Sequence, residues 1–318
     1  MRVVFIGTSE FAVPSLEALI ASAHEVVAVV SQPDRPKGRG REMQLTPVKE
    51  IALAHSIPVL QPEKIREPEV IAEIKGLGDI DVIIVVAYGQ KIPKELLEWP
   101  SCGAINVHGS ILPKYRGAAP IQHAIIAGEQ QTGITTMLMD EGLDTGDILL
   151  QEAIDIYPNE TAGELGQRLA LLGSRLLIRT LEDMEEGILN PIPQDDELAT
   201  LARSLPRNAG VIDWRKDANY IVNLVRGCTP KPGGFTKFNS TLVKVLGSKV
   251  EKLEGKFGEP GEITEIARDG IIVAAGSGAV KLIEIQPESR KRMGAADYAR
   301  GCGLKVGDRF EIWFEMGG

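Results

Sequence analysis

The stretch Asp81-Val82-Ile83-Ile84-Val85-Val86-Ala87 decides the fold class of the first half of the chain. Five β-branched apolar side chains follow one another there without a polar interruption. This pattern is typical of a strand that is buried on both faces, and such strands occur mostly in parallel sheets with helices on both sides. The stretch therefore predicts an α/β domain built around a parallel, Rossmann-like sheet.

The segments around this strand alternate between strand and helix patterns. Arg2–Ile6 and Glu25–Val30 are further apolar runs, and Val13–Ser22, Pro47–His55 and Pro68–Leu77 have helical patterns. Downstream lie two extended runs and a long amphipathic helix, at Ala104–His108, Ile134–Met139 and Glu164–Glu186. Short apolar strands that alternate with helices indicate right-handed crossovers within one parallel sheet.

A change of pattern after residue 189 predicts a domain boundary. Asn190–Gln194 and Asp195–Glu197 combine prolines with acidic residues, as exposed linkers do. A helix candidate at Asp217–Arg226 follows. Short alternating strands come next, at Thr241–Leu246, Gly261–Ile266, Gly270–Ala275, Ala279–Ile285 and Phe310–Phe314. We expect a first domain over residues 1–189, a linker over 190–206 and a β-barrel, OB-like domain over 207–318.

The charge of the chain is polarised along its length. Hydrophobic residues make up 43% and charged residues 25% of the 318 residues, which excludes disordered and collagen-like classes. The net charge of −9, taken alone, argues against a nucleic-acid partner. However, Arg203–Val250 carries nine basic and two acidic residues, a local charge of +7 that leaves −16 for the rest. This basic segment is compatible with RNA binding.

Other sequence signals exclude several classes of protein. Three cysteines, far apart in sequence, predict neither a disulfide framework nor a zinc site. The apolar run before Gly7 is too short for a signal peptide, and no window reaches the roughly 18 apolar residues of a membrane span. The turn at Gly7 reads GTSEF rather than G-x-G-x-x-G, which argues against a nicotinamide cofactor. We expect a cytoplasmic protein that contacts no membrane and holds no metal.

Asn106 and His108 are the strongest candidates for catalytic side chains. Residues two apart in a strand share a face, so these two side chains point the same way at the end of a predicted strand. An amide and an imidazole placed there can donate to a developing oxyanion. Asp144 lies between Gly142 and Gly146, in a loop tight enough to hold its carboxylate against the imidazole. A buried core histidine and a solvated acidic loop remain the alternatives.

Five motifs make the chain resemble the methionyl-tRNA formyltransferase family, and the resemblance covers nearly the whole chain. They are GTSEFA at 7–12, SQPDRPKGRG at 31–40, VVAYGQKIP at 85–93, NVHGSILPKYRGAAPIQ at 106–122 and MDEGLDTGDIL at 139–149. The resemblance implies an N-terminal formyltransferase domain, a C-terminal domain that binds tRNA, and a monomer. It also implies that 10-formyltetrahydrofolate is the formyl donor and methionyl initiator tRNA the acceptor.

The same resemblance assigns roles to particular residues. It makes Asn106, His108 and Asp144 the catalytic trio. It places the folate against two segments, Ser110-Ile111-Leu112-Pro113 and the turn Val86-Ala87-Tyr88-Gly89. It also implies tRNA contacts from a set of basic residues, namely Arg35, Lys37, Arg39, Arg41, Arg203 and Arg207.

Alternatives remain for the molecule that accepts the formyl group. A formyltransferase for a sugar-nucleotide amine and a 10-formyltetrahydrofolate hydrolase share the catalytic motifs. The segment Asp34–Arg41, with four basic residues and two glycines, favours the tRNA substrate, because arginine bonds phosphates and base edges. A solvated flexible loop is the plainer interpretation of this segment. A catalytically idle RNA-binding module is disfavoured by the intact trio.

Overall fold

The computed structural model of this chain describes residues 1–37 and 42–311. Contacts group the chain into two compact units. The first contains Met1–Pro120, Thr132–Ile154 and Gly166–Arg203, and the second contains Ile121–Gln131, Asp155–Leu165 and the chain from Ser204 onward. Each unit has its own sheet, and each is described by itself below.

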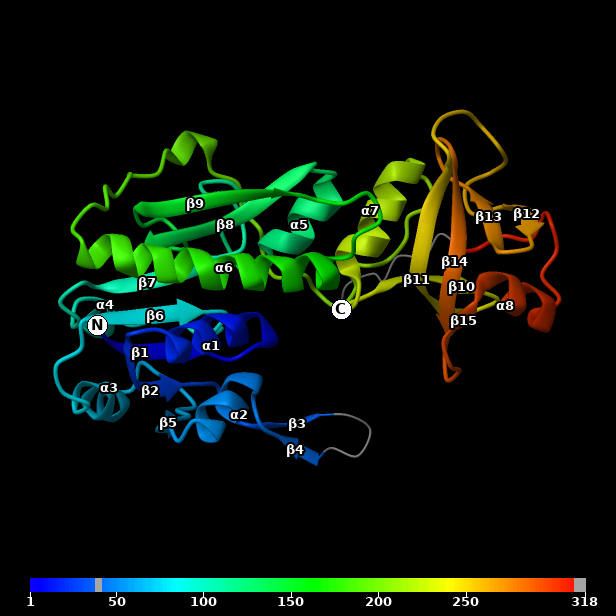
Figure 1. The fold of residues 1–318 in the computed structure, drawn as a ribbon. Helices are drawn as coiled ribbons and strands as arrows, with labels where there is room; N and C mark the ends of the chain where they lie inside the picture. The colour runs from blue at the N-terminus through cyan, green and yellow to red at the C-terminus, as the bar shows by residue number, and fades with distance from the viewer. Residues whose placement is uncertain (38–41, 312–318) are drawn as a thin grey trace. The chain divides into compact units, whose positions relative to one another are not determined.

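The first unit is built on a seven-stranded sheet in the order β5-β2-β1-β6-β7-β8-β9 (Figure 1). The strands from β5 to β7 are parallel to their neighbours, whereas β8 runs antiparallel to β7. Their bounds are β1 Arg2–Gly7, β2 Glu25–Val30, β5 Val59–Leu60, β6 Val82–Val86, β7 Ala104–His108, β8 Gln131–Leu138 and β9 Ile148–Asp155. The predicted α/β fold is confirmed, with a mixed sheet instead of a wholly parallel one.

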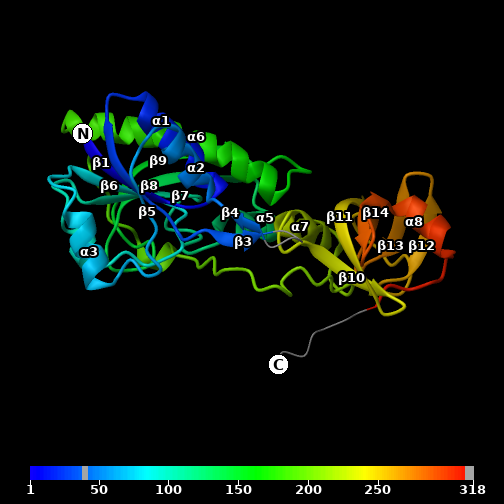
Figure 2. The same cartoon turned by 90° about the horizontal axis from the view of Figure 1, so that it is seen from below.

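Helices cover both faces of this sheet, as the fully apolar β6 predicts. Figure 2 shows α1 and α6 on one side of the strands and α3 on the other. Alternate strand residues such as Val4, Ile83 and Val85 pack with Ile74 of α3 in one apolar cluster. The bounds are α1 Val13–Ala21, α2 Pro47–Ala54, α3 Pro68–Lys75, α4 Lys94–Leu97 and α6 Ala162–Glu185, with a 3-10 turn at Glu10–Ala12.

The segment expected to be a basic loop is partly a hairpin. Arg35–Lys37 forms β3 and pairs antiparallel with β4, Glu42–Gln44. Sequence patterns missed both strands because their residues are mostly polar and show no apolar alternation. Arg39 and Arg41 lie outside the described residues.

The second unit is an antiparallel sheet in the order β10-β11-β14-β13-β12, with β15 beside β14. Its strands are β10 Gly234–Phe238, β11 Thr241–Lys252, β12 Ile263–Ala267, β13 Gly270–Ala274, β14 Ala279–Pro287 and β15 Met293–Gly294. Arg309 bridges to Glu262 beside β12, and Glu311 bridges to Lys237 in β10. The segment Arg309–Glu311 therefore joins the two edge strands, which matches the expected closed β fold. Of the expected strand Phe310–Phe314, only the first two residues are described.

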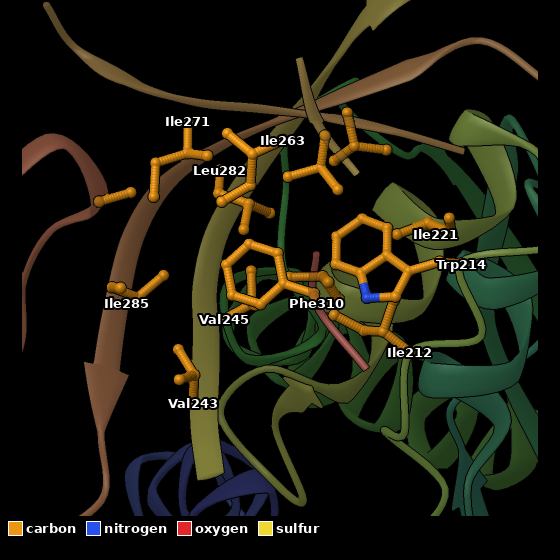
Figure 3. Packing of buried hydrophobic residues seen from close by; sticks show 14 of the residues in the cluster. Ile212, Trp214, Ile221, Val243, Val245, Ile263, Ile271, Leu282, Ile285 and Phe310 are labelled. Carbon is orange, nitrogen blue, oxygen red and sulfur yellow. The ribbon is translucent and has the colours of Figure 1, made fainter. Parts of the chain in front are cut away.

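The core of the second unit gathers around two aromatic rings (Figure 3). Trp214 and Phe310 are fully buried and stack with ring centroids 5.8 Å apart. The indole Nε1 of Trp214 donates to Thr236 Oγ1 at 3.0 Å, so its polar atom is satisfied. Among the described residues, the helices α5 Pro120–Ala127, α7 Ala218–Cys228 and α8 Ala295–Cys302 lie wholly or almost wholly in this unit. Helix α8 is not apparent from the sequence pattern, because its buried face consists largely of alanine.

Candidate active site

Asn106 and His108 lie on the face of β7 that points away from α6. Val107 faces the helix, because a Cβ added to Gly173 of α6 would lie 2.9 Å from its side chain. Strand alternation therefore turns Asn106 and His108 to the opposite face, at the carboxyl end of β7. Their partners across the sheet are Met137 and Thr135 of β8. Ligands bind at this edge of parallel sheets.

His108 is buried and contacts two groups through its two ring nitrogens. Nε2 lies 3.0 Å from the carbonyl oxygen of Tyr115. Because a carbonyl oxygen only accepts, we assign a hydrogen to Nε2. Nδ1 lies 3.7 Å from Asp144 Oδ2, which is an ion-pair distance when the imidazole is protonated and leaves Nδ1 without a direct hydrogen bond to the carboxylate.

Asn106 is half-buried beside His108. Its side-chain amide makes no hydrogen bond to any residue in the described ranges. Its donor hydrogens are therefore available to a bound substrate. The structure thus places the amide and the imidazole together, as the two-residue spacing predicts.

Asp144 is held beside His108 by its own loop. Its φ of +54° lies in the left-handed region, which aspartate tolerates better than most side chains. Oδ2 accepts a hydrogen bond from the main-chain N–H of Gly117 at 2.7 Å, which fixes the position of the carboxylate. A Cβ on Gly146 would lie 1.8 Å from the carbonyl oxygen of Leu138, so glycine is required there. The carboxylate of Asp144 is 15% exposed.

The two segments expected to contact folate follow neighbouring parallel strands. The turn Val86–Gly89 ends β6, and Ser110–Pro113 follows β7. In the first, Val86 and Tyr88 are buried, so Ala87 and Gly89 are the exposed members. Burial raises the pKa of the Tyr88 phenol to about 12. This side chain therefore packs in the core, and the exposed part of the turn is largely main chain.

Thr135 and Gln151 fix the backbone of the second segment. The Thr135 hydroxyl donates to Ser110 O at 2.7 Å and accepts from Leu112 N at 3.1 Å. Gln151 Nε2 donates to Leu112 O at 2.8 Å. Neither residue was among the site residues predicted from the sequence. The pair Thr135-Thr136 interrupts the apolar run of β8, and this polar interruption could have indicated a structural role for Thr135.

The basic residues are distributed less simply than the sequence suggests. Arg35, Arg203 and Arg207 are exposed. Arg226, from the basic segment, instead donates to the carbonyl oxygens of Tyr157 and Glu160. The guanidinium of Arg215 bonds Asp213. Arg226 and Arg215, which contribute to the +7 charge, therefore bind partners within the second unit.

No group of three or more His, Cys, Asp or Glu side chains lies together as metal ligands would, within residues 1–37 and 42–311. Across the same part of the chain, no helix is both long and apolar enough to cross a membrane.

Comparisons with known proteins agree with this geometry. A family model described as formyl transferase matches residues 1–181, and one described as formyl transferase, C-terminal domain, matches residues 205–303. The methionyl-tRNA formyltransferase of Geobacter metallireducens is 48% identical over 309 residues, which are 97% of this chain and 98% of that protein. The enzyme of the same name from Citrifermentans bemidjiense is 50% identical over 307 residues, 96% of this chain and 95% of that protein.

A solved structure has a similar fold. WlaRD, a sugar 3N-formyl transferase solved in the presence of dTDP and 5-N-formyl-THF, has a TM-score of 0.67 at 18% identity and covers 92% of this chain and 99% of its own. This similarity concerns the fold. The near-complete matches to curated relatives and the family models identify the molecule as an enzyme that transfers formyl groups. The chain belongs to the methionyl-tRNA formyltransferase family.

Proposed function

We propose that this enzyme transfers the formyl group of 10-formyltetrahydrofolate to the α-amino group of methionyl initiator tRNA. The observation that carries the mechanism is the arrangement at the end of β7. Asn106 and His108 share one face, and Asp144 lies 3.7 Å from the imidazole. These groups suit the attack of an amine on a formyl carbon.

The reaction needs stabilisation of a negative charge on the formyl oxygen. As the methionyl nitrogen bonds to the formyl carbon, that oxygen becomes an alkoxide. The unpaired amide of Asn106 and the protonated Nδ1 of His108 donate to it, while the hydrogen on Nε2 remains bonded to Tyr115 O. Loss of one such donor typically costs about 3–4 kcal/mol in barrier height.

Asp144 stabilises the imidazolium that this step requires. Its carboxylate is anchored by Gly117 N and faces Nδ1. The attacking amine needs only mild activation, since α-amino groups have pKa values near roughly 8 and are largely neutral at slightly alkaline pH. The proton that the amine loses passes to N10 of the departing tetrahydrofolate as the bond from the formyl carbon to N10 breaks and the C=O bond re-forms.

The donor is proposed to lie along the two segments that end β6 and follow β7. Ala87 and Gly89 expose main chain there, and the backbone of Ser110–Pro113 is held rigid by Thr135 and Gln151. Main-chain donors and acceptors suit the flat, polar pterin ring. The presence of 5-N-formyl-THF with WlaRD supports a folate-type donor.

The RNA is proposed to contact the basic hairpin and the segment that leads into the second unit. Arg35, Arg203 and Arg207 are exposed there, and Lys37, Arg39 and Arg41 are proposed contacts from sequence. We also propose the domain division 1–189, 190–206 and 207–318, with the last part selecting the acceptor. The enzyme is proposed to act as a monomer in the cytoplasm, where initiator tRNA is used.

One assay tests the reaction. The protein is incubated with 10-formyltetrahydrofolate and charged Met-tRNA, and formyl-methionyl product is measured. Asn106→Ala, His108→Ala and Asp144→Ala are each expected to lower turnover by at least about a hundredfold while the fold is retained. Near-normal turnover in a folded Asp144→Ala protein would exclude its proposed role.

The same assay separates the alternatives. Formate released without an acceptor amine would indicate a hydrolase. Formylation of a sugar-nucleotide amine in place of Met-tRNA would indicate the sugar-directed activity. Either result would overturn the proposed acceptor while leaving the catalytic residues in place.

A further inference from the structure

Gln194 lies in the segment expected to be an exposed linker, but its side chain turns toward the catalytic loop. Every other residue from Pro191 to Leu198 is exposed, and Gln194 alone is half-buried. Its Nε2 donates to Asp144 O at 2.9 Å and to Gly146 O at 2.7 Å. Both carboxamide hydrogens are therefore used on the backbone that carries Asp144.

The left-handed conformation of Asp144 needs such support. A non-glycine residue at φ +54° costs of the order of 1 kcal/mol or more and persists when its surroundings over-determine it. Gln194 holds the peptide oxygen of Asp144 itself and that of Gly146 two residues on. Gly117 N holds the carboxylate from the other side. The loop is thereby fixed at three points.

Arg116 ties Gln194 to the segment Tyr115–Gly117, which contacts both catalytic groups. The buried Arg116 donates through Nε to Gln194 Oε1 at 3.0 Å, and its Nη1 lies 2.8 Å from Asp196 Oδ1. Its sequence neighbours are Tyr115, whose carbonyl accepts from His108, and Gly117, whose N–H holds Asp144. Hydrogen bonds, together with the covalent chain of Tyr115–Gly117, therefore connect Gln194 to both sides of the His108–Asp144 pair.

The main chain of the same segment is also bound to the first unit. Ile192 and Ile148 exchange two hydrogen bonds of 2.8 and 2.9 Å. Thr200 O accepts from Arg116 N at 2.8 Å, and Ala202 N donates to Arg116 O at 2.7 Å. Gln194 thus projects from a segment anchored on both of its sides, so its position is fixed before any substrate binds.

We propose that Gln194 is a positioning residue, which sets the distance between Asp144 and His108 through its carboxamide and contacts no reacting atom. This inference rests on the proposed role of Asp144. It assigns to the segment after α6 a part in catalysis, in addition to its part in joining the two units.

The test compares Gln194→Leu and Gln194→Glu with the native enzyme. Leucine, which is similar in size, removes the bonds to Asp144 O and Gly146 O and the bond from Arg116. Glutamate keeps the acceptor for Arg116 but replaces the donors with an oxygen that opposes two carbonyl oxygens. Both variants are expected to lower kcat roughly tenfold to a hundredfold, the effect of a small displacement of a catalytic group. KM for Met-tRNA and for 10-formyltetrahydrofolate should change by less than about threefold, because no substrate contact is lost.

Gln131→Leu is the matched control. Gln131 also uses its carboxamide Nε2, but on exposed Asp155 in the second unit. The Gln131→Leu substitution should leave kcat unchanged. Melting temperatures are measured for all three variants. If Gln194→Leu fails to fold, kcat of Gln194→Glu is compared with that of the native enzyme instead.

A double-mutant comparison distinguishes positioning from a general loss of structure. In an Asp144→Asn background, Gln194→Leu should lower the residual single-turnover rate no further, because its effect passes through the carboxylate. A folded Gln194→Leu enzyme with native kcat, or an equal further loss in the Asp144→Asn background, overturns the inference. Full activity of Asp144→Asn alone would instead overturn the role proposed for Asp144.

Discussion

Three non-glycine residues near the site hold a left-handed backbone. Ala87, Tyr115 and Asp144 have φ values of 46°, 62° and 54°. Each such conformation costs about 1–3 kcal/mol unless local hydrogen bonds compensate. Tyr115 presents its carbonyl to His108, and Asp144 presents its carboxylate to the same ring. The strain thus coincides with the residues that orient the imidazole.

Gly117 offers a test at the residue scale. Its φ is +122°, and a Cβ there would lie 2.7 Å from Ala202 O. Gly117→Ala is therefore expected to lower the free energy of unfolding by about 1–3 kcal/mol. It should also reduce formyl transfer, because the N–H that holds Asp144 moves. Urea unfolding and the transfer assay measure the two effects.

Gly187→Ala is the control for this substitution. Gly187 has a φ of +69°, but an added Cβ would meet nothing within 4 Å. Its substitution should cost about 1 kcal/mol and leave turnover unchanged. Equal losses of activity in the two variants would contradict the assignment of Gly117 to the site.

At the scale of elements, the β3–β4 hairpin is anchored at its base by a polar cluster. Lys49 of α2 donates to Asp34 Oδ2 and to Gln61 Oε1, each at 2.5 Å. Gln61 Nε2 donates to Asp34 Oδ1 at 2.9 Å. Burial alone would raise the pKa of Asp34, but the hydrogen bonds from Lys49 and Gln61 outweigh it and hold the pKa below its usual value.

This cluster predicts a pH-dependent loss in Lys49→Met. Because the folded pKa of Asp34 lies below the unfolded value, its stabilisation is complete above roughly pH 4–5 and is lost as pH falls through the folded pKa. The variant should lose about 1–3 kcal/mol of unfolding free energy at pH 7. The difference from the native protein should shrink below about pH 4, as urea titrations at several pH values would reveal.

Lys94→Met provides the comparison, because Lys94 is exposed and pairs only at the surface with Glu98 and Glu141. Exposed pairs of this kind contribute little to stability, because solvent and salt screen them. A Lys49→Met deficit that stays constant down to strongly acidic pH would show that Asp34 is not the group that responds.

At the scale of the whole molecule, a chain with a net charge of −9 is proposed to bind a polyanion through local basic surface. Met-tRNA affinity should therefore fall steeply with salt. Replacing both Arg203 and Arg207 with alanine should weaken binding and reduce the log–log salt slope by about one per lost phosphate contact. Filter binding between low and physiological salt measures the slope. An unchanged slope would place the RNA elsewhere.

The grouping of the chain into two units also belongs to this scale. A sequence boundary near residue 190 treats the molecule as two consecutive blocks, but α5 and Asp155–Leu165 group with the chain after Ser204. A Cβ on Gly227 of α7 would lie 2.5 Å from Ile126 of α5, so these helices pack closely. Periodicity identified α7 as a helix, yet it carried no information about this partner. Contacts between distant segments decided the grouping.

The sequence by itself determined the class of each element with a clear apolar pattern, and it determined the candidates for catalysis. The apolar run of β6, the β-branched strands and the period of α6 are local patterns, and local patterns encode strand or helix. The spacing of Asn106 and His108 likewise fixes a shared face in any strand. Local patterns do not encode the direction of a strand, which is why β8 was expected in a parallel sheet.

Only the tertiary structure decided what holds the site together. The bonds of Asp144 to Gly117 and Gln194 join residues 27 and 50 positions apart, and Arg116 reaches Gln194 across 78. Polar contacts of this kind depend on single atoms meeting after the sheet has formed, and no periodicity of the chain records them. Hydrophobic patterning therefore selected the scaffold, and long-range hydrogen bonds set the geometry of the His108–Asp144 pair.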